Sequence, residues 1–413
     1  MQMTFFVHLI GQFQPALIFS MEETGWNYNL FQGLLNQKMI VINQNKFKMK
    51  KLIYTLLLSL FPFMIAAQSV FSVNGLCIAA PEHDGVEKFV EFIEKELGPA
   101  GINTLVLRVD NNYAYKSRPR LQNENPLTEK DVKKIVMASK KHGIEIIPQV
   151  NLFGHQSWHS KLGKLLEVYP EFDETPHIKL PEKYEWPNED ELYCKSYCPR
   201  HPEVHDVVFD LMDEIMEVFE AKAFHAGLDE VFYIADSKCP RCKGSDPAAL
   251  FAEEVTTLSN HLEEKGSKLW IWGDRLIDAA TADLGMWEAS MNNTARAIDM
   301  IPKTVVICDW HYERAIPTPA YFALKGFDVI ACPYRKAKVA EAQVKMMSDF
   351  KHNSTPQTSE KFLGVMHTVW SSADKFLEEY YNPTANDERG SPVDCFKAMT
   401  NAVKKIDEQN SEN

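Results

Sequence analysis

Basic residues are scarce relative to acidic ones in this sequence. Its 413 residues include 44 Lys and Arg against 57 Asp and Glu, which gives a formal net charge of -13 at pH 7. Proteins that bind nucleic acid neutralise its phosphates with patches of Lys and Arg, so this balance argues against a nucleic-acid partner. It does not argue against a neutral ligand such as a glycan. The remaining composition is that of a globular protein with one large or two medium domains.

A hydrophobic run suited to crossing a bilayer is also missing. The apolar run 52–67 is short and is interrupted by Pro62, so we expect no stable membrane span in the mature chain. Because Met49-Lys50-Lys51 precedes the run and Ala66-Ala67 ends it, we predict a secretory signal peptide over residues 49–67. A buried helix or a membrane anchor is the alternative. No Cys directly follows the run, so a lipoprotein anchor is not indicated.

The predicted signal peptide bears on where the mature protein is located and on how residues 1–48 are interpreted. It places the mature protein outside the cytoplasm, in the periplasm or the extracellular space, and starts it near Gln68. Residues 1–48 show no clean hydrophobic period. We interpret them as an extension from a start site assigned too far upstream, or as a disordered segment, and leave them out of the fold argument.

No Gly-rich phosphate loop follows the first predicted strand, which weakens the case for an open, doubly wound sheet. From Val70 onward, β-rich runs alternate with amphipathic helices, the last of which covers about 392–406. Eight such alternations predict an α/β fold, a closed (β/α)8 TIM barrel that forms a single catalytic domain over residues 68–413. The predicted strands are 70–80, 103–109, 144–152, 224–231, 268–274, 304–312, 328–334 and 362–370.

Local signals set some of the boundaries between these elements. Thr128, with Asp131 three residues later, predicts the start of a helix that Gly143 ends. A long polar insertion follows the third strand and runs to about Arg200. Pro202 fits the first turn of the next helix.

Carboxylates and tryptophans gather where the predicted strands end. In (β/α)8 barrels these C-terminal ends carry the active site. Asp229-Glu230 end the fourth strand, and Trp272, Trp310 and Trp370 lie at the ends of the fifth, sixth and eighth. Pyranose rings stack on indole and their hydroxyls bond carboxylates, so the set predicts a sugar site. Taken singly, a Trp could cap the core and an acidic pair could be a solvated turn.

Three stretches of the sequence resemble glycoside hydrolase family 20, the β-N-acetylhexosaminidases. His225-Ala-Gly-Leu-Asp-Glu-Val231 is similar to the family's fourth-strand motif His-x-Gly-Gly-Asp-Glu. Ile147-Pro-Gln-Val-Asn-Leu-Phe-Gly-His155 resembles its third strand, which ends in Pro-Gly-His, and Leu105-Val-Leu-Arg-Val-Asp110 resembles its second. The resemblance extends over about residues 70 to 406.

The resemblance implies a substrate-assisted retaining mechanism, in which the oxygen of the substrate's 2-acetamido group is the nucleophile. Glu230 would be the general acid and base, and Asp229 would orient the acetamido N–H and stabilise the oxazolinium-like intermediate. No cofactor is implied. Two adjacent carboxylates suit this chemistry, because like charges raise the pKa of one of them. The residues expected to bind the glycan are Arg108, Asp110, His155, Trp272, Trp310, Tyr312 and Trp370.

Several positions depart from the family pattern. The Arg usual at the end of the first strand is absent from 79–83, and Trp370 is not followed by the usual x-Glu. Arg108 stands where a His is usual, and Leu228 replaces the second Gly of the motif. The sugar, its linkage, exo or endo action, and a glycan-binding barrel without turnover therefore remain open. A metal-dependent hydrolase would need clustered His ligands, whereas the His residues here are scattered.

The eight cysteines fall into two groups. Cys77, Cys308 and Cys332 lie within predicted strands and are expected to be small buried hydrophobes. A second set forms C-x3-C and C-x2-C pairs in loops near Asp229, and consists of Cys194, Cys198, Cys239 and Cys242. The spacing fits either a structural zinc or disulfides, and export favours disulfides. The sequence does not indicate an oligomeric state.

Overall fold

The structure is a computed structural model, and it describes residues 69–188, 193–383 and 390–412. The predicted signal peptide over 49–67 and the preceding residues 1–48 lie outside these ranges. The described part of the chain belongs to the compact unit that covers residues 67–413. None of its helices combines the length and apolar character that crossing a membrane requires.

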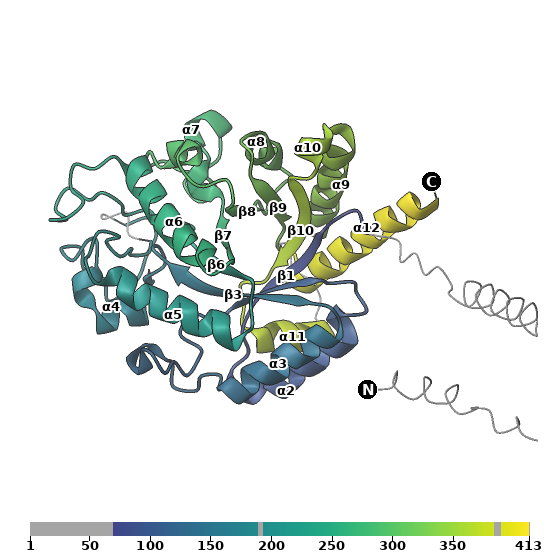
Figure 1. Cartoon of the computed structure of the whole chain (residues 1–413), viewed down its shortest axis with the longest axis horizontal. Helices are drawn as coiled ribbons and strands as arrows, with labels where there is room; N and C mark the ends of the chain where they lie inside the picture. Colours follow the sequence, from purple (N-terminus) through teal and green to yellow (C-terminus); the bar gives the residue numbers. More distant parts are fainter. Residues whose placement is uncertain (1–68, 189–192, 384–389, 413) are drawn as a thin grey trace, which may run out of the picture. The chain divides into compact units, whose positions relative to one another are not determined.

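Eight parallel strands close into a barrel in the order β1-β10-β9-β8-β7-β6-β3-β2, which confirms the predicted (β/α)8 fold (Figure 1). The strands are β1 (Val73–Ala79), β2 (Thr104–Arg108), β3 (Glu145–Leu152), β6 (Ala223–Gly227), β7 (Lys268–Trp272), β8 (Val306–Trp310), β9 (Asp328–Cys332) and β10 (Phe362–Thr368). Strands β4 (Ser157–Trp158) and β5 (Lys161–Leu162) form a separate antiparallel hairpin. Because the barrel strands are parallel, all eight C-terminal ends meet at one rim.

Helices surround the barrel (Figure 1). They are α2 (Val86–Phe92), α3 (Glu129–Lys141), α4 (Lys164–Val168), α5 (Val204–Val218), α6 (Pro247–Glu263), α7 (Ala279–Ala282), α8 (Thr318–Leu324), α9 (Ala337–Asn353), α10 (Pro356–Ser359), α11 (Ala373–Tyr381) and α12 (Pro392–Glu412). A π-helical turn (Ile93–Leu97) continues α2. Short 3-10 turns are His83–Gly85, Pro119–Leu121, Pro170–Phe172, Asp274–Leu276 and Ala295–Asp299.

The predicted boundary signals at α3 are confirmed. The Thr128 hydroxyl accepts from the amide of Asp131, whose carboxylate accepts from the Thr128 amide in return. Gly143 follows the helix with φ +69°, a conformation that costs glycine little. The prediction for α5 was less accurate, because Pro202 lies just before the helix, which begins at Val204.

Among the described residues, buried hydrophobic side chains form three clusters, two of which make the core of the barrel. The larger one packs the helices against the outer face of the barrel. The smaller one fills the barrel itself and includes Cys77, Cys308 and Cys332, which are fully buried as predicted. Trp272 lies in this inner layer, with none of its surface exposed. The barrel interior is therefore packed, and any ligand site lies above it, at the rim.

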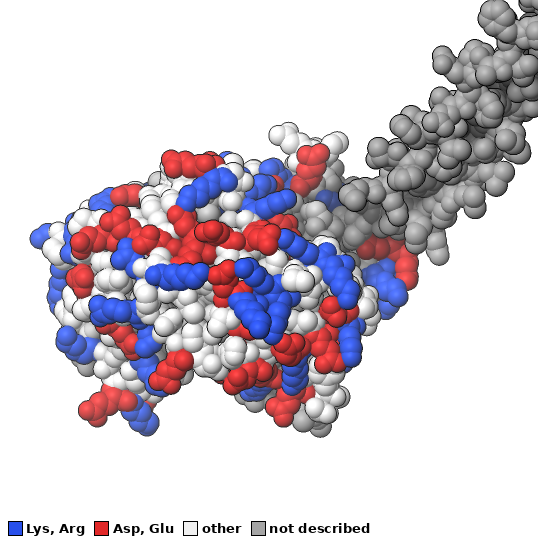
Figure 2. Space-filling model, turned by 60° about the horizontal axis from the view of Figure 1, so that its bottom comes forward, with Lys and Arg blue, Asp and Glu red and all other residues white. Residues whose placement is uncertain are grey.

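The surface charge is mixed in sign on the face drawn in Figure 2. Acidic and basic side chains are interspersed there rather than gathered by sign. Exposed ion pairs also link neighbouring elements, such as Lys134 with Glu87 and Lys140 with Glu220. Such exposed pairs contribute little to stability. On the face drawn, the charge pattern does not identify a partner.

Candidate active site

A cavity of about 600 Å³ opens at the C-terminal rim of the barrel. It brings together side chains from the ends of β2, β3, β6, β8 and β10 and from the long loops after β3 and β7. Seven of the nine site residues predicted from the sequence line it. The lining residues are Arg108, Asn151, His155, Ser157, Trp158, Tyr193, Asp229, Glu230, Trp287, Trp310, Tyr312 and Trp370.

A turn with several residues in the left-handed backbone conformation carries the carboxylates of Asp229 and Glu230. Strand β6 stops at Gly227, earlier than predicted, because Gly227, Leu228 and Glu230 have φ values of +72°, +64° and +50°. Such values occur rarely outside glycine and cost of order 1 kcal/mol or more each for other residues. A Cβ at position 227 would lie 2.4 Å from Oδ1 of Asn151. This turn carries both Asp229 and Glu230 into the cavity wall, where they are 7% and 8% exposed.

His155 bridges the two carboxylates. Its Nε2 lies 3.1 Å from Oδ2 of Asp229 and 3.2 Å from Oε2 of Glu230. Burial alone would lower the pKa of the imidazole, but the charge of Asp229 and the hydrogen bonds to both carboxylates raise it well above its ordinary value. His155 is therefore an imidazolium that neutralises part of the charge of the pair.

The environment drives the two carboxylates apart in pKa. Burial raises the pKa of Glu230, and the neighbouring charges of Asp229 and Asp274 add to the rise, which outweighs the bond to His155. Burial acts on Asp229 as well, but there the charge and hydrogen bond of His155 outweigh it and hold the pKa below its ordinary range. The pair thus combines a proton donor in Glu230 with a stable anion in Asp229, the division of roles that acid catalysis needs.

One oxygen of Asp229 has no partner among the described residues. Its Oδ1 is buried and accepts no hydrogen bond from them, whereas Oδ2 is bonded to His155. A buried, unsatisfied carboxylate oxygen is costly unless a ligand completes it. The free oxygen of Asp229 is therefore an acceptor for an N–H or O–H group of a ligand in the cavity.

Asp274 holds the backbone of Glu230 in place. Its Oδ2 accepts from the Glu230 amide and from Nε of Arg275, and its Oδ1 accepts from Nε1 of Trp310 at 3.3 Å. Arg275 in turn donates to the carbonyls of Met286 and Ala289. Position at a strand end was the sequence signal for Asp274, but its bond to the Glu230 amide could not be predicted from spacing alone.

Three further lining residues contact one another in the cavity wall: Arg108, Tyr312 and Trp370. Nε1 of Trp370 donates to the Tyr312 hydroxyl at 2.8 Å, and the Arg108 guanidinium lies 4.8 Å from the centre of the Trp370 ring. Arg108 donates from Nη2 to the carbonyl of Val369, while its buried Nε has no partner. Burial raises the pKa of Tyr312 well above its ordinary value, so the phenol stays a neutral hydrogen-bonding group.

Asp110 and Trp272 do not line this cavity, although both were expected to bind substrate. Trp272 points into the barrel interior, 4.5 Å from the His225 ring and 5.7 Å from the Trp370 ring. Asp110 turns into the wall, where Oδ1 accepts from the Asn151 amide at 2.7 Å. It lines a second cavity of about 670 Å³, which shares only Arg108 with the first. Each nevertheless contacts a residue that lines the first cavity: Asp110 accepts from the Asn151 amide, and Trp272 packs near the Trp370 ring.

The insertion after β3, which was predicted only to be polar, supplies part of an aromatic wall. Trp158 and Tyr193 come from this insertion and Trp287 from the β7–β8 loop. The Tyr193 ring centre lies 5.2 Å from that of Trp158 and 4.5 Å from that of Trp287. Trp158 is 49% exposed. The loop residues could not be assigned from sequence, because no strand-end rule places them.

Among the described residues, two groups of side chains could hold a metal ion. His155, Asp229 and Glu230 form one. The second differs from the cysteine set predicted from the sequence. Cys198, Cys239 and Cys242 come together with Glu174, whereas the Sγ of Cys194 lies 3.5 Å from the carbonyl oxygen of Glu230. Cys194 therefore lies outside the cluster in which it was expected, because its thiol faces the main chain of Glu230 instead.

Comparisons with known proteins identify related sequences and structures. The family model described as glycosyl hydrolase family 20, catalytic domain, matches residues 107–376. The lacto-N-biosidase of Bifidobacterium bifidum is 28% identical over 234 residues, 53% of this chain and 19% of that protein. The β-hexosaminidase of Akkermansia muciniphila is 27% identical over 135 residues, 32% of this chain and 25% of that protein. The chain thus matches a quarter or less of the length of these two relatives.

Solved structures show the same barrel. The chitobiase of Flavobacterium johnsoniae superposes with a TM-score of 0.57 at 15% identity, over 83% of this chain and 52% of that one. A β-N-acetylhexosaminidase superposes with a TM-score of 0.55 at 16% identity, over 83% and 76%. At these identities the likeness establishes the fold.

Proposed function

Because the chain belongs to glycoside hydrolase family 20, we propose that it hydrolyses terminal β-linked N-acetylhexosamine, GlcNAc or GalNAc, from glycans. The mechanism is substrate-assisted and retaining. The 2-acetamido oxygen attacks the anomeric carbon while the bond to the leaving oxygen breaks, and water then opens the resulting oxazolinium. The names of the relatives, a lacto-N-biosidase and a β-hexosaminidase, support this class of substrate.

The unpartnered Oδ1 of Asp229 is the observation that carries the proposal. It lies in the cavity wall on a carboxylate that His155 keeps ionised. An acetamido N–H would satisfy this oxygen, and the anion would stabilise the positive charge that develops as the oxazolinium forms. Asp229 therefore positions and activates the nucleophile without forming a covalent bond.

Glu230 is the general acid and then the general base. Burial and the neighbouring carboxylates raise its pKa and so favour the protonated form, which can donate a proton to the leaving oxygen. After departure of the leaving group, its carboxylate takes a proton from the attacking water. Trp310 and Trp370 supply ring faces for the sugar, and Tyr312 supplies a hydroxyl for the acetamido oxygen.

Removal of a disaccharide is a second candidate. No Arg stands at the end of β1 to close the cavity, and the second cavity beyond Arg108 extends the space at this side. A terminal disaccharide could occupy both. The relative named lacto-N-biosidase supports this candidate at the level of its name. No observation favours an endo-acting enzyme or a glycan-binding barrel over these two candidates.

The purified protein should be assayed on aryl β-glycosides of GlcNAc, GalNAc and an N-acetylhexosamine-terminated disaccharide, with the aryl glucoside as the substrate without an acetamido group. Glu230→Gln and Asp229→Asn are compared with Glu341→Gln, a change on the exposed side of α9. Hydrolysis confined to the acetamido sugars and lost only in the first two variants supports the proposal. Equal hydrolysis of the glucoside, or activity unchanged in Asp229→Asn, would contradict the substrate-assisted mechanism.

Export is part of this proposal, because the predicted signal peptide over 49–67 would place the enzyme where glycans are met. Expression with the full N-terminus, cell fractionation and N-terminal sequencing test it. A mature protein outside the cytoplasm that begins near Gln68 is expected. A cytoplasmic protein that retains residues 49–67 would contradict it.

A further inference from the structure

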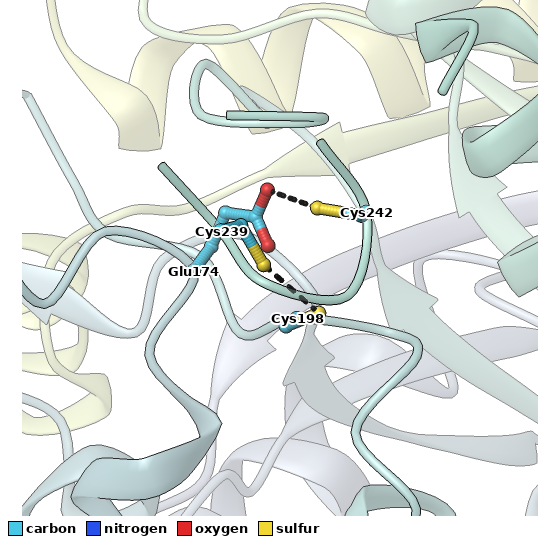
Figure 3. Close-up of side chains that lie close together, drawn as sticks. All are labelled: Glu174, Cys198, Cys239 and Cys242. Atoms are coloured by element: carbon cyan, nitrogen blue, oxygen red, sulfur yellow. Dashed lines mark hydrogen bonds between the residues drawn. The ribbon is translucent and has the colours of Figure 1, made fainter. Parts of the chain in front are cut away.

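Four buried side chains converge in the loops beside the active site (Figure 3). Glu174 and Cys198 come from the insertion between β3 and α5, and Cys239 and Cys242 from the loop between β6 and α6. All four are at most 1% exposed. One oxygen or sulfur atom from each lies within 4.8 Å of all the others. They come from segments far apart in sequence, so the fold itself assembles the cluster.

The sulfur atoms are spaced for a shared ion rather than for a covalent bond. Sγ of Cys198 lies 3.5 Å from Sγ of Cys239, whereas a disulfide bond is about 2.05 Å long. Two thiolates on one tetrahedral Zn²⁺, each about 2.3 Å from the metal, are about 3.8 Å apart. The observed spacing is close to that value.

Glu174 carries the second, independent observation. Its Oε1 accepts from the Asp236 amide at 2.9 Å and from the Cys242 thiol at 2.7 Å. Among the described residues, its buried Oε2 has no hydrogen-bond partner, and none of them forms an ion pair with this carboxylate. A fully buried carboxylate without a cation is costly, and a bound cation among the three thiols would offset that cost.

The loop that carries Cys239 and Cys242 is tightly turned. The Cys239 carbonyl accepts from the Lys243 amide, and the Cys242 carbonyl accepts from the Ser245 amide. Gly244 lies between them with φ +77°, a conformation that lets the chain turn sharply after the second Cys. Both sulfurs consequently face the same side of the turn, toward Glu174 and Cys198 (Figure 3).

We infer that Cys198, Cys239, Cys242 and Glu174 bind one Zn²⁺ in a tetrahedral structural site. Three thiolates exclude Ca²⁺ and Mg²⁺, which prefer oxygen ligands, and four protein ligands leave no open position for catalysis. The three thiols release their protons on binding. The spread of up to 4.8 Å contracts by about 1 Å to reach the tetrahedral edge expected from Zn–S bonds of about 2.3 Å.

The proposed zinc links the two loops that flank the cavity. Cys239 and Cys242 follow the turn that presents Glu230. The segment with Glu174 and Cys198 also contains Lys195, whose amide donates to Oγ of Ser157 in the cavity lining. Zinc at this site would fix the aromatic wall relative to the catalytic turn. The inference does not depend on which sugar is hydrolysed, or on whether hydrolysis occurs.

The test is the metal content of the intact protein, purified under reducing conditions without chelator and measured by elemental mass spectrometry. One zinc per chain is expected. Glu174→Gln and Cys242→Ser should weaken zinc binding at least tenfold, since even residues behind a metal ligand change affinity by about 10–100-fold. Cys194→Ser is the matched control and should keep its zinc, because its sulfur lies outside the cluster. Equal loss in Cys194→Ser would overturn the ligand set.

A second measurement uses only the wild-type protein, so it tests the inference even if the variants fail to fold. Co²⁺ added to the metal-free wild-type protein should give the strong visible absorption of tetrahedral cobalt with thiolate charge-transfer bands, and Zn²⁺ should displace it. Removal of zinc should lower the melting temperature, with recovery on adding zinc back. A wild-type protein that takes up neither metal, or that contains a Cys198–Cys239 disulfide by thiol counting and peptide mapping, would overturn the inference. Glycosidase activity enters neither measurement.

Discussion

Oδ2 of Asp274 accepts a hydrogen bond of 2.9 Å from the backbone amide of Glu230. The contact joins the end of β7 to the turn after β6, and it fixes the residue that we propose as the general acid through its main chain. Asp274 is buried and pairs with Arg275. Asp274 is therefore a positioning residue for Glu230, and its negative charge also helps to raise the pKa of Glu230.

Asp274→Asn should separate these two effects. The amide oxygen can still accept from the Glu230 amide, but the negative charge that helps to raise the pKa of Glu230 is lost. The alkaline limb of the kcat/KM profile should move to lower pH. Leaving Arg275 buried and unpaired should cost roughly 3–5 kcal/mol of stability, so unfolding by denaturant is measured alongside. An alkaline limb that does not move would limit Asp274 to a structural role.

The pH profile of the wild-type enzyme should be bell-shaped. Activity should fall at high pH as Glu230 loses its proton, and the raised pKa keeps the acid form to higher pH than an ordinary Glu. It should fall at low pH as Asp229 gains a proton, and its lowered pKa delays that loss. In His155→Gln both limbs should shift to higher pH, because the imidazolium lowers the pKa of both carboxylates. A simple packing defect would lower the maximum without moving the limbs.

Glu230→Gln should reduce kcat/KM by about 10²–10⁴-fold, the range of general acid catalysis. The loss should be smaller for a dinitrophenyl glycoside than for a methylumbelliferyl or natural glycoside, because a good leaving group needs little protonation. Asp229→Asn should instead impair both kinds of substrate alike, since it acts on the acetamido group. The same dependence on leaving group in both variants would argue against the two separate roles.

Trp158→Ala should raise KM for extended glycans while leaving an aryl monosaccharide nearly unaffected. The exposed indole offers a face to sugar units beyond the first, and loss of one stacking contact of about 1 kcal/mol corresponds to about fivefold. Tyr321→Ala on α8 is the matched control, an exposed aromatic side chain that does not line the cavity. The same KM change for both substrates would contradict a role restricted to the outer sugars.

Gly227→Ala should be far more harmful than Gly143→Ala. Both glycines have φ near +70°, but an added Cβ at 227 meets Oδ1 of Asn151 at 2.4 Å, and at 143 it meets nothing within 4 Å. The backbone term of about 1 kcal/mol is common to both. Only the 227 variant should also lose activity, because the clash displaces the turn that carries Asp229 and Glu230. Equal melting temperatures for the two variants would contradict this account.

The sequence predicted the barrel well, because hydrophobic runs and helix signals recur eight times and Thr128 with Asp131 marks a helix start directly. It predicted the strand ends less well. The fourth strand was placed over 224–231, yet it ends at Gly227. Left-handed values at Leu228 and Glu230 stop it, and apolar patterning does not encode them.

Site residues that follow strands were easier to predict than those on loops. Asp229, Glu230 and Trp370 lie where the strand-end rule puts them. Trp272 does not line the cavity, because alternate side chains of a strand point inward and the rule gives no direction. Trp158, Tyr193 and Glu174 come from a long insertion, whose path depends on tertiary contacts. That path also explains why Glu174, and not Cys194, lies with Cys198, Cys239 and Cys242.

Leu228 couples the backbone strain of the turn after β6 to the packing of the core. The family motif that this stretch resembles has a glycine at this place, where φ is +64° in this chain. The leucine side chain is 1% exposed and belongs to the core. Returning to glycine would relieve about 1 kcal/mol of backbone strain, but would open a cavity costing about 2–5 kcal/mol. At this position the packing of the side chain therefore outweighs the strain of the backbone.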